Sequence, residues 1–178
     1  MSRKILVCDN TSVGVIAKDS KGRILLIERK IFPFGWAPPS GHCDGQTYPI
    51  ACFNEFEEET GLKVVGAPRP VTLFKSKKYF KCRRGGEYHN WQIFEVDWKG
   101  ELKPNRDETK NAEWFTIEEI CELAEKTRNH TGRMRALSNP AIPASVVSST
   151  IEVLEREWQA NPGLEPVWCE FFRELRII

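Results

Sequence analysis

The chain has 178 residues, of which 40% are hydrophobic and 29% are charged, and its formal net charge is +1. This composition is typical of one globular domain, or one domain with a small extension, and it excludes a disordered chain. A near-neutral charge provides no overall field for a nucleic-acid polymer or an anionic membrane, and no apolar run reaches the roughly 20 residues of a membrane span. We therefore expect neither kind of partner. Because the N-terminus lacks a signal-peptide pattern, we expect a cytoplasmic protein.

Two strands are predicted first. Residues 13–17 alternate apolar residues with others, residues 19–22 supply turn chemistry, and residues 23–29 resume the apolar run. Residues 31–46 contain three prolines and three glycines, which predicts a shaped loop and excludes a helix.

A helix is predicted from Pro49 to Thr60, where Gly61 suits the left-handed residue that ends helices. Its apolar residues can share one side: Ile50, Ala51, Phe53 and Phe56.

Further strands are predicted at residues 62–76 and 87–98, with a hairpin tip between them. A short strand then ends at Phe115, and Thr116 with Glu119 forms the capping box of a second helix.

The last part of the chain reads as two helices. Apolar residues recur at helical spacing over residues 147–158 and again over residues 164–175. The order of elements predicts an α+β fold, a layered α/β/α domain with a mixed sheet, over residues 1–138. Residues 139–178 are expected to form a helical extension whose large apolar groups must be buried, either on the domain or in the arm of a homodimer.

The six cysteines are expected to be reduced thiols, because none falls in a CxxC pair and their spacings are wide and irregular. His42 next to Cys43 suggests metal ligands, but two adjacent ligands without a second pair do not make a zinc motif.

The end of the first helix gathers negative charge. Glu55, Glu58 and Glu59 stand at positions i, i+3 and i+4, so they share one face, whereas Glu57 points elsewhere. Like charges at this spacing, near a helix C-terminus, are locally unfavourable. A divalent cation that prefers oxygen ligands, Mg²⁺, Mn²⁺ or Ca²⁺, would compensate them. The alternative is a solvated acidic face, which many surface helices carry.

The stretch "GHCDGQTYPIACFNEFEEETGL" resembles the box of Nudix hydrolases, and flanking similarity extends the resemblance over about residues 11–125. Two positions depart from the family pattern: Asn54 stands where the family has Arg, and Gln46 stands where it has the first Glu. The loop after Gly41 is also one residue short. Because Asn54 removes a positive charge from an acidic patch, we expect raised carboxylate pKa values and looser positioning.

The resemblance implies Mg²⁺-dependent (or Mn²⁺-dependent) hydrolysis of a phosphoanhydride in a nucleoside diphosphate linked to another moiety. It also implies a small-molecule nucleotide as the substrate. The metal ligands implied are Glu55, Glu59 and Glu58, with the backbone carbonyl of Ser40. The alternative is a nucleotide-binding or regulatory module that kept the fold and lost turnover. A prenyl-diphosphate isomerase on the same fold would need a catalytic Cys, and neither Cys43 nor Cys82 lies in a matching pattern.

A general base has to come from outside the box, within hydrogen-bond reach of the attacking water. Glu108 lies on a loop before the late strand, where the family often supplies this carboxylate, and Asp107 and Glu113 are rivals. A solvated loop glutamate is the alternative for Glu108.

Substrate contacts are expected from Arg29, for the phosphates, and from the aromatic residues Phe34, Trp36 and Trp91, which can stack a base. A surface arginine and packing in the fold are the alternatives. A basic stretch, residues 77–84, could attract an anion or form a solvated hairpin tip.

Overall fold

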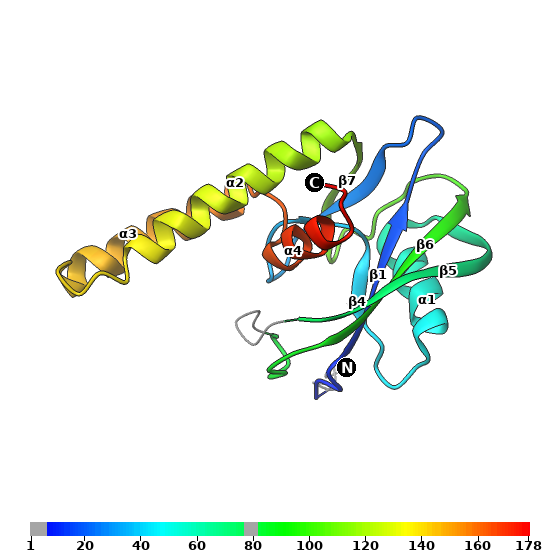
Figure 1. The fold of residues 1–178 in the computed structure, drawn as a ribbon, viewed down its shortest axis with the longest axis horizontal. Helices are drawn as coiled ribbons and strands as arrows, with labels where there is room; N and C mark the ends of the chain where they lie inside the picture. Colours follow the sequence, from blue (N-terminus) through cyan, green and yellow to red (C-terminus); the bar gives the residue numbers. More distant parts are fainter. Residues whose placement is uncertain (1–6, 77–81) are drawn as a thin grey trace.

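The computed structural model describes residues 7–76 and 82–178 (Figure 1). Of the predicted hairpin tip and its basic stretch, residues 77–81 lie outside the described residues. Among the residues that are described, no helix is both long enough and apolar enough to cross a membrane.

In the part of the chain that the structure describes, seven strands form two sheets. The four-stranded sheet has the order β4-β1-β6-β5, in which β1 and β6 are parallel and the other pairs are antiparallel. The three-stranded sheet is antiparallel, with the order β3-β2-β7. The strands are β1 (Thr11–Ala17), β2 (Ile24–Arg29), β3 (Trp36–Ala37), β4 (Ser40–His42), β5 (Lys63–Lys75), β6 (Asn90–Lys99) and β7 (Thr109–Phe115).

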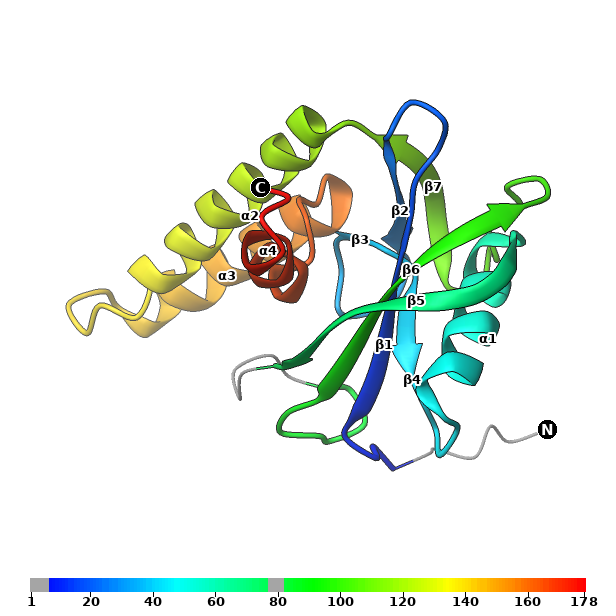
Figure 2. The ribbon, with the colours of Figure 1, turned by 45° about the vertical axis from the view of Figure 1, so that its right-hand side comes forward.

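The described residues form four helices, and Figure 2 shows α1 on the side of the sheets opposite α2 and α4. They are α1 (Tyr48–Thr60), α2 (Ile117–Ala136), α3 (Ala144–Ala160) and α4 (Pro166–Glu174). The predicted α+β fold is confirmed, and its strands are divided between a mixed sheet and an antiparallel sheet.

Two apolar clusters hold these layers together. Val13 and Val15 of β1 pack with Phe56 of α1 on one side. Ile16, from the opposite face of the same strand, packs with Trp168 of α4 on the other side. The period of two along β1 therefore places successive side chains in different clusters.

The ends of the first two helices follow their sequence signals. Gly61, with φ of 73°, ends α1 in the left-handed conformation. Thr116 and Glu119 form the predicted capping box of α2. The expectation for the apolar side of α1 is wrong in part, because Ile50 and Phe53 are 52% and 36% exposed. Sequence spacing did not separate the side that packs on the sheet from the side that faces solvent.

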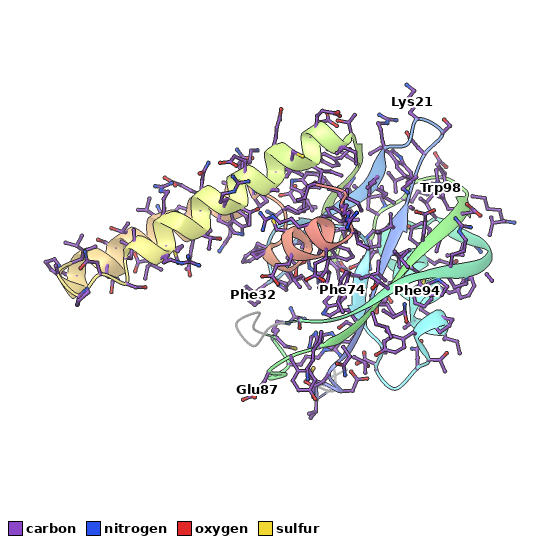
Figure 3. All side chains as sticks on the ribbon, in the orientation of Figure 1. Lys21, Phe32, Phe74, Glu87, Phe94 and Trp98 are labelled. Carbon is purple, nitrogen blue, oxygen red and sulfur yellow. The ribbon has the colours of Figure 1, made fainter. Side chains whose placement is uncertain are left out.

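Helices α2 and α3 run side by side as an arm that projects from the body, whereas α4 lies against the body (Figures 1 and 2). Trp168, Phe171 and Phe172 of α4 are buried, as expected for the large apolar groups of the tail. Phe74 of β5 stacks on Phe171 with ring centroids 4.6 Å apart, and it lies below α4 in Figure 3. A boundary at residue 138 and a dimer through the arm stay predictions.

Candidate active site

The acidic end of α1 divides into buried and exposed side chains. Glu59 is 3% exposed, Glu55 is half-buried, and both Glu57 and Glu58 are exposed. Glu57 turns toward solvent and pairs with Lys63. The helical spacing therefore brings two of the four carboxylates inward, at the point where α1 passes β4.

Glu59 is held by two groups from different strands. Its Oε2 accepts a hydrogen bond of 2.7 Å from the backbone N–H of Ser40, the first residue of β4. Its Oε1 lies 3.9 Å from a guanidinium nitrogen of Arg29, at the end of β2. The same nitrogen of Arg29 donates to the carbonyl oxygen of Ser40 at 3.3 Å. The predicted phosphate-binding Arg29 is therefore connected to two of the predicted metal ligands, Glu59 and Ser40.

Glu55 lies directly against the backbone of Gly41. A Cβ atom added at Gly41 would overlap the carboxylate of Glu55. A side chain at position 41 would have to displace this carboxylate, so the glycine allows Glu55 to lie on the backbone of β4.

The pKa values of both inward carboxylates are raised. Burial raises the pKa of Glu59 to about 8, against the opposing effect of Arg29, and Glu55 adds to the rise. Burial followed by the nearby Glu58 raises the pKa of Glu55 to about 7, with Arg29 again opposing. The raised pKa values agree with the expectation from the sequence. Their main cause is burial, whereas the expected cause was the missing positive charge at Asn54. A bound cation would favour the ionised forms that burial disfavours.

The two departures from the Nudix pattern contact each other. Asn54 donates a hydrogen bond of 2.7 Å from Nδ2 to Oε1 of Gln46, and both side chains are exposed. The amide of Asn54 is thus engaged on the outer side of the box, with Gln46 as its partner. A neutral pair occupies the two positions where the family pattern has oppositely charged residues.

Arg29, Ser40, Glu55 and Glu59 line a cavity of about 790 Å³, whereas Asn54 and Gln46 do not. Glu108 also lines it and is half-buried, and its carbonyl oxygen accepts a hydrogen bond of 2.8 Å from the backbone N–H of Lys30. The rivals Asp107 and Glu113 are exposed and are not among the lining residues. The predicted catalytic and metal-binding residues on the cavity wall are Arg29, Ser40, Glu55, Glu58, Glu59 and Glu108.

The three predicted stacking residues have different positions. Phe34 lines the cavity and is partly exposed, so its ring is available to a ligand. Trp91 reaches the cavity wall but is only 8% exposed, because it packs edge-on against Trp168. Trp36 does not line the cavity, since its ring packs on Phe115 with centroids 4.8 Å apart. Trp36 therefore packs within the fold in this structure, and a contact with substrate stays a prediction that its position does not support.

The sequence did not indicate that the C-terminal helices complete this cavity. Glu165, just before α4, is a buried lining residue, and its backbone N–H donates to the carbonyl oxygen of Trp36 at 2.7 Å. Burial raises the pKa of Glu165 to about 7, with Arg29 opposing. From the arm, Trp158 stacks on His130 at 4.5 Å, and both rings line the cavity. These contacts join parts of the chain far apart in sequence, which local patterns do not reveal.

The donor set suits a hard divalent cation. Carboxylate oxygens and a backbone carbonyl are the ligands that Mg²⁺ and Mn²⁺ prefer. The glutamates do not form a group of three ligand atoms close enough to hold one ion, since among residues 7–76 and 82–178 the group that does so consists of Cys and His. One or two carboxylates with retained waters and substrate phosphates is the usual Mg²⁺ arrangement, and these residues fit it.

Comparison with known proteins agrees with this geometry. The NUDIX domain family matches residues 9–137. The chain belongs to the Nudix family. No curated protein matches the sequence.

Solved Nudix structures share the fold. A MutT NUDIX hydrolase from Burkholderia pseudomallei is similar with a TM-score of 0.52 and 24% identity, covering 61% of this chain and 84% of that one. A NUDIX hydrolase from Nitrosomonas europaea has a TM-score of 0.51 and 20% identity, covering 88% of this chain and 93% of that one. A MutT protein from Methanosarcina mazei Go1 has a TM-score of 0.51 and 19% identity, covering 83% and 93%.

Proposed function

We propose that the protein hydrolyses a phosphoanhydride bond in a nucleoside diphosphate linked to another moiety, with Mg²⁺ or Mn²⁺. The observation that carries the proposal is the position of Glu59. Its buried carboxylate is held by Ser40 and Arg29 at the wall of a cavity of about 790 Å³ that Glu55 and Glu108 also line. A buried cluster of carboxylates is unfavourable without a cation, and an open cavity beside it can admit a diphosphate.

The inward glutamates and the carbonyl of Ser40 would hold the metal. When bound, the cation would neutralise diphosphate charge and lower the pKa of a water molecule, so that water becomes a better nucleophile. Ser40 and Arg29 orient Glu59 for this task, because each of its two carboxylate oxygens faces one of them.

Arg29 would bind the substrate phosphates. Burial opposes its charge, but Glu165 and then Glu59 raise the pKa of Arg29, so the guanidinium stays ionised at the cavity wall. Its Nε is buried and lacks a hydrogen-bond partner among the described residues. A phosphate oxygen is a suitable acceptor for such a donor, and the resulting charge-assisted bond would position the diphosphate.

Glu108 is the proposed general base. It is half-buried at the cavity wall, close enough for its charge to raise the pKa values of Glu55 and Glu59. From that position it can accept the proton that an attacking water releases. Phe34 and the stacked rings of His130 and Trp158 would contact the base or the second moiety of the substrate.

A second candidate is a nucleotide-binding or regulatory module that no longer turns over its ligand. The neutral pair of Asn54 and Gln46 favours it, because the family pattern has charged residues at both positions. Incubation with Mg²⁺ or Mn²⁺ and a panel of ADP-ribose, NADH, dinucleoside polyphosphates and oxidised nucleotides separates the two candidates.

Release of a nucleoside monophosphate from one panel member, lost in Glu59→Gln and retained in Glu57→Gln, supports the hydrolase. Glu57→Gln is the matched control, because this neighbour on α1 is exposed and pairs with Lys63 outside the cavity. Binding without product, at neutral and alkaline pH, would contradict the hydrolase and support the module. A homodimer through the arm and a cytoplasmic location remain predictions, and light scattering after gel filtration tests the first.

A further inference from the structure

Four thiol and imidazole side chains meet at one end of the four-stranded sheet. They come from Cys8, His42, Cys82 and His89, here called the thiol–imidazole cluster. One ligand atom from each residue, a sulfur or a ring nitrogen, lies within 4.8 Å of all the others. All four residues are half-buried. His42 belongs to the stretch that matches the Nudix box, the other three residues lie outside it, and none of the four belongs to the glutamate site.

The sheet topology explains why residues so far apart in sequence meet here. Strands β1 and β6 are parallel, so their first residues lie at the same end of the sheet. Cys8 shortly precedes β1, and His89 immediately precedes β6. Strand β4 runs antiparallel to β1, so its last residue, His42, pairs with Ser12 at that same end. Cys82 lies in the connection from β5 to β6.

The contacts within the cluster are short. Cys8 Sγ lies 3.0 Å from His89 Nε2, and Cys82 Sγ lies 3.3 Å from His42 Nε2. The two imidazole rings are 4.7 Å apart at an angle of 71°. In tetrahedral zinc sites with two Cys and two His ligands, bond lengths of about 2.0–2.3 Å separate neighbouring ligand atoms by roughly 3.3–3.8 Å. Small side-chain adjustments would convert the observed arrangement into that geometry.

Each sulfur already accepts a backbone hydrogen bond. The N–H of Asn10 donates to Cys8 Sγ at 3.3 Å, and the N–H of Arg84 donates to Cys82 Sγ at 3.3 Å. Both donors lie two residues after the cysteine that they contact. Such donors stabilise a metal-bound thiolate and fix its direction.

The imidazoles are also prepared for a metal. Ser12 Oγ lies 3.1 Å from Nδ1 of His89, which leaves Nε2 of the same ring directed into the cluster. His42 likewise directs its Nε2 toward Cys82 Sγ, at 3.3 Å. A hydrogen bond at the other ring nitrogen, as Ser12 makes to His89, fixes the orientation of a metal-binding imidazole.

We propose that the thiol–imidazole cluster binds one Zn²⁺ as a structural site. Two sulfur and two nitrogen donors select zinc over the hard cations that the glutamates would take. Four protein ligands leave no open position, which is the arrangement of structural rather than catalytic zinc. The ion would tie the segment before β1, the end of β4 and the β5–β6 connection to one another. His42, Cys82 and His89 also line the cavity, so the ion would stiffen one of its walls.

This proposal does not depend on hydrolysis, and metal binding tests it directly. The full-length protein, stripped of metal and kept reduced, is titrated with Co²⁺, which substitutes for Zn²⁺ and reports tetrahedral thiolate ligands by visible absorption. We expect saturation at one Co²⁺ per chain and bleaching of the bands by an equivalent of Zn²⁺, but not by a large excess of Mg²⁺. Cys8→Ser and Cys82→Ser should each lose the bands. The control Cys121→Ser should keep them, because Cys121 is exposed on α2.

X-ray absorption of the zinc-loaded wild-type protein identifies the ligand atoms without depending on variants that fail to fold. The expected first shell contains two sulfur atoms at about 2.3 Å and two nitrogen atoms at about 2.0 Å. The proposal is overturned by a shell of oxygen atoms, by equal Co²⁺ binding in Cys82→Ser and Cys121→Ser, or by a Cys8–Cys82 disulfide that persists in the reduced preparation.

Discussion

Replacing Trp168 by alanine tests whether α4 is an integral part of the folded domain. The indole is fully buried and lies between β1, Phe171 and Phe172. Truncation of a buried Trp or Phe to Ala costs about 3–5 kcal/mol, because contacts are lost and a cavity remains. For a chain of this size each kcal/mol lowers the melting temperature by about 2–4 °C, so we expect a decrease of roughly 6–20 °C.

Gly14, which lies opposite Trp168, provides a second substitution, and its expected effect on stability is a loss. A Cβ atom at Gly14 would overlap the indole ring and would lie 2.9 Å from Cδ1 of Ile93. Gly14→Ala should therefore cost about 1–3 kcal/mol through overpacking in the wild-type protein. In the Trp168→Ala background the space above β1 is open, so the same substitution should cost much less. The double-mutant cycle should give a coupling of about 1–3 kcal/mol.

Urea denaturation followed by circular dichroism measures all four proteins. A single cooperative transition that shifts in Trp168→Ala is the expected result. A loss below about 1 kcal/mol, or a separate early transition that leaves the main one unchanged, would refute the packing of α4 into the domain. Additive costs for the two substitutions would refute the contact between the indole and β1.

Three further predictions concern the cavity and the Nudix box beside it. Gly41→Ala should reduce hydrolysis at least tenfold in steady-state assays, because the new Cβ displaces the carboxylate of Glu55, and unchanged turnover would count against this geometry. Glu165 has a pKa raised to about 7 by burial, so its contribution to stability falls as the pH rises from about 4.5 through 7. The decrease in the free energy of unfolding between urea titrations at about pH 5 and about pH 8.5 should be smaller in Glu165→Gln than in the wild-type protein. An equal decrease would contradict the raised pKa of Glu165. Asn54→Arg combined with Gln46→Glu should change stability by less than about 1 kcal/mol and turnover by less than about threefold, because both side chains are exposed. A gain of tenfold or more would show that the neutral pair impairs catalysis.

The glutamate helix could be predicted from the sequence because its signals are local. Helical spacing separated Glu57 from Glu55 and Glu59, and Gly61 marked the end of the helix. The short strands β3 and β4 were not predicted, because two or three residues among prolines and glycines carry no periodic pattern. β3 forms by pairing with β2, and β4 forms by pairing with β1. These pairings exist only in the folded chain.

Contacts between distant segments account for the rest. Glu165 reaches the cavity only because β3 pairs with the segment before α4, and nothing near Glu165 in the sequence indicates this. The thiol–imidazole cluster was missed for the same reason. The sequence drew attention to Cys43 beside His42, but Cys43 is buried in the apolar cluster under α1, and His42 faces Cys82 from another connection. Irregular cysteine spacing in sequence does not exclude a compact ligand set in space.

Binding of Mn²⁺, followed by its electron paramagnetic resonance signal, tests whether the carboxylates of Glu55 and Glu59 hold a divalent cation. The measurement compares zinc-saturated wild-type protein, the double variant Glu55→Gln with Glu59→Gln, and the control Glu57→Gln, so that the thiol–imidazole cluster cannot contribute. We expect saturable Mn²⁺ binding in the wild-type and control proteins and loss of this binding in the double variant. Equal affinity in all three would contradict a cation site at the buried end of α1.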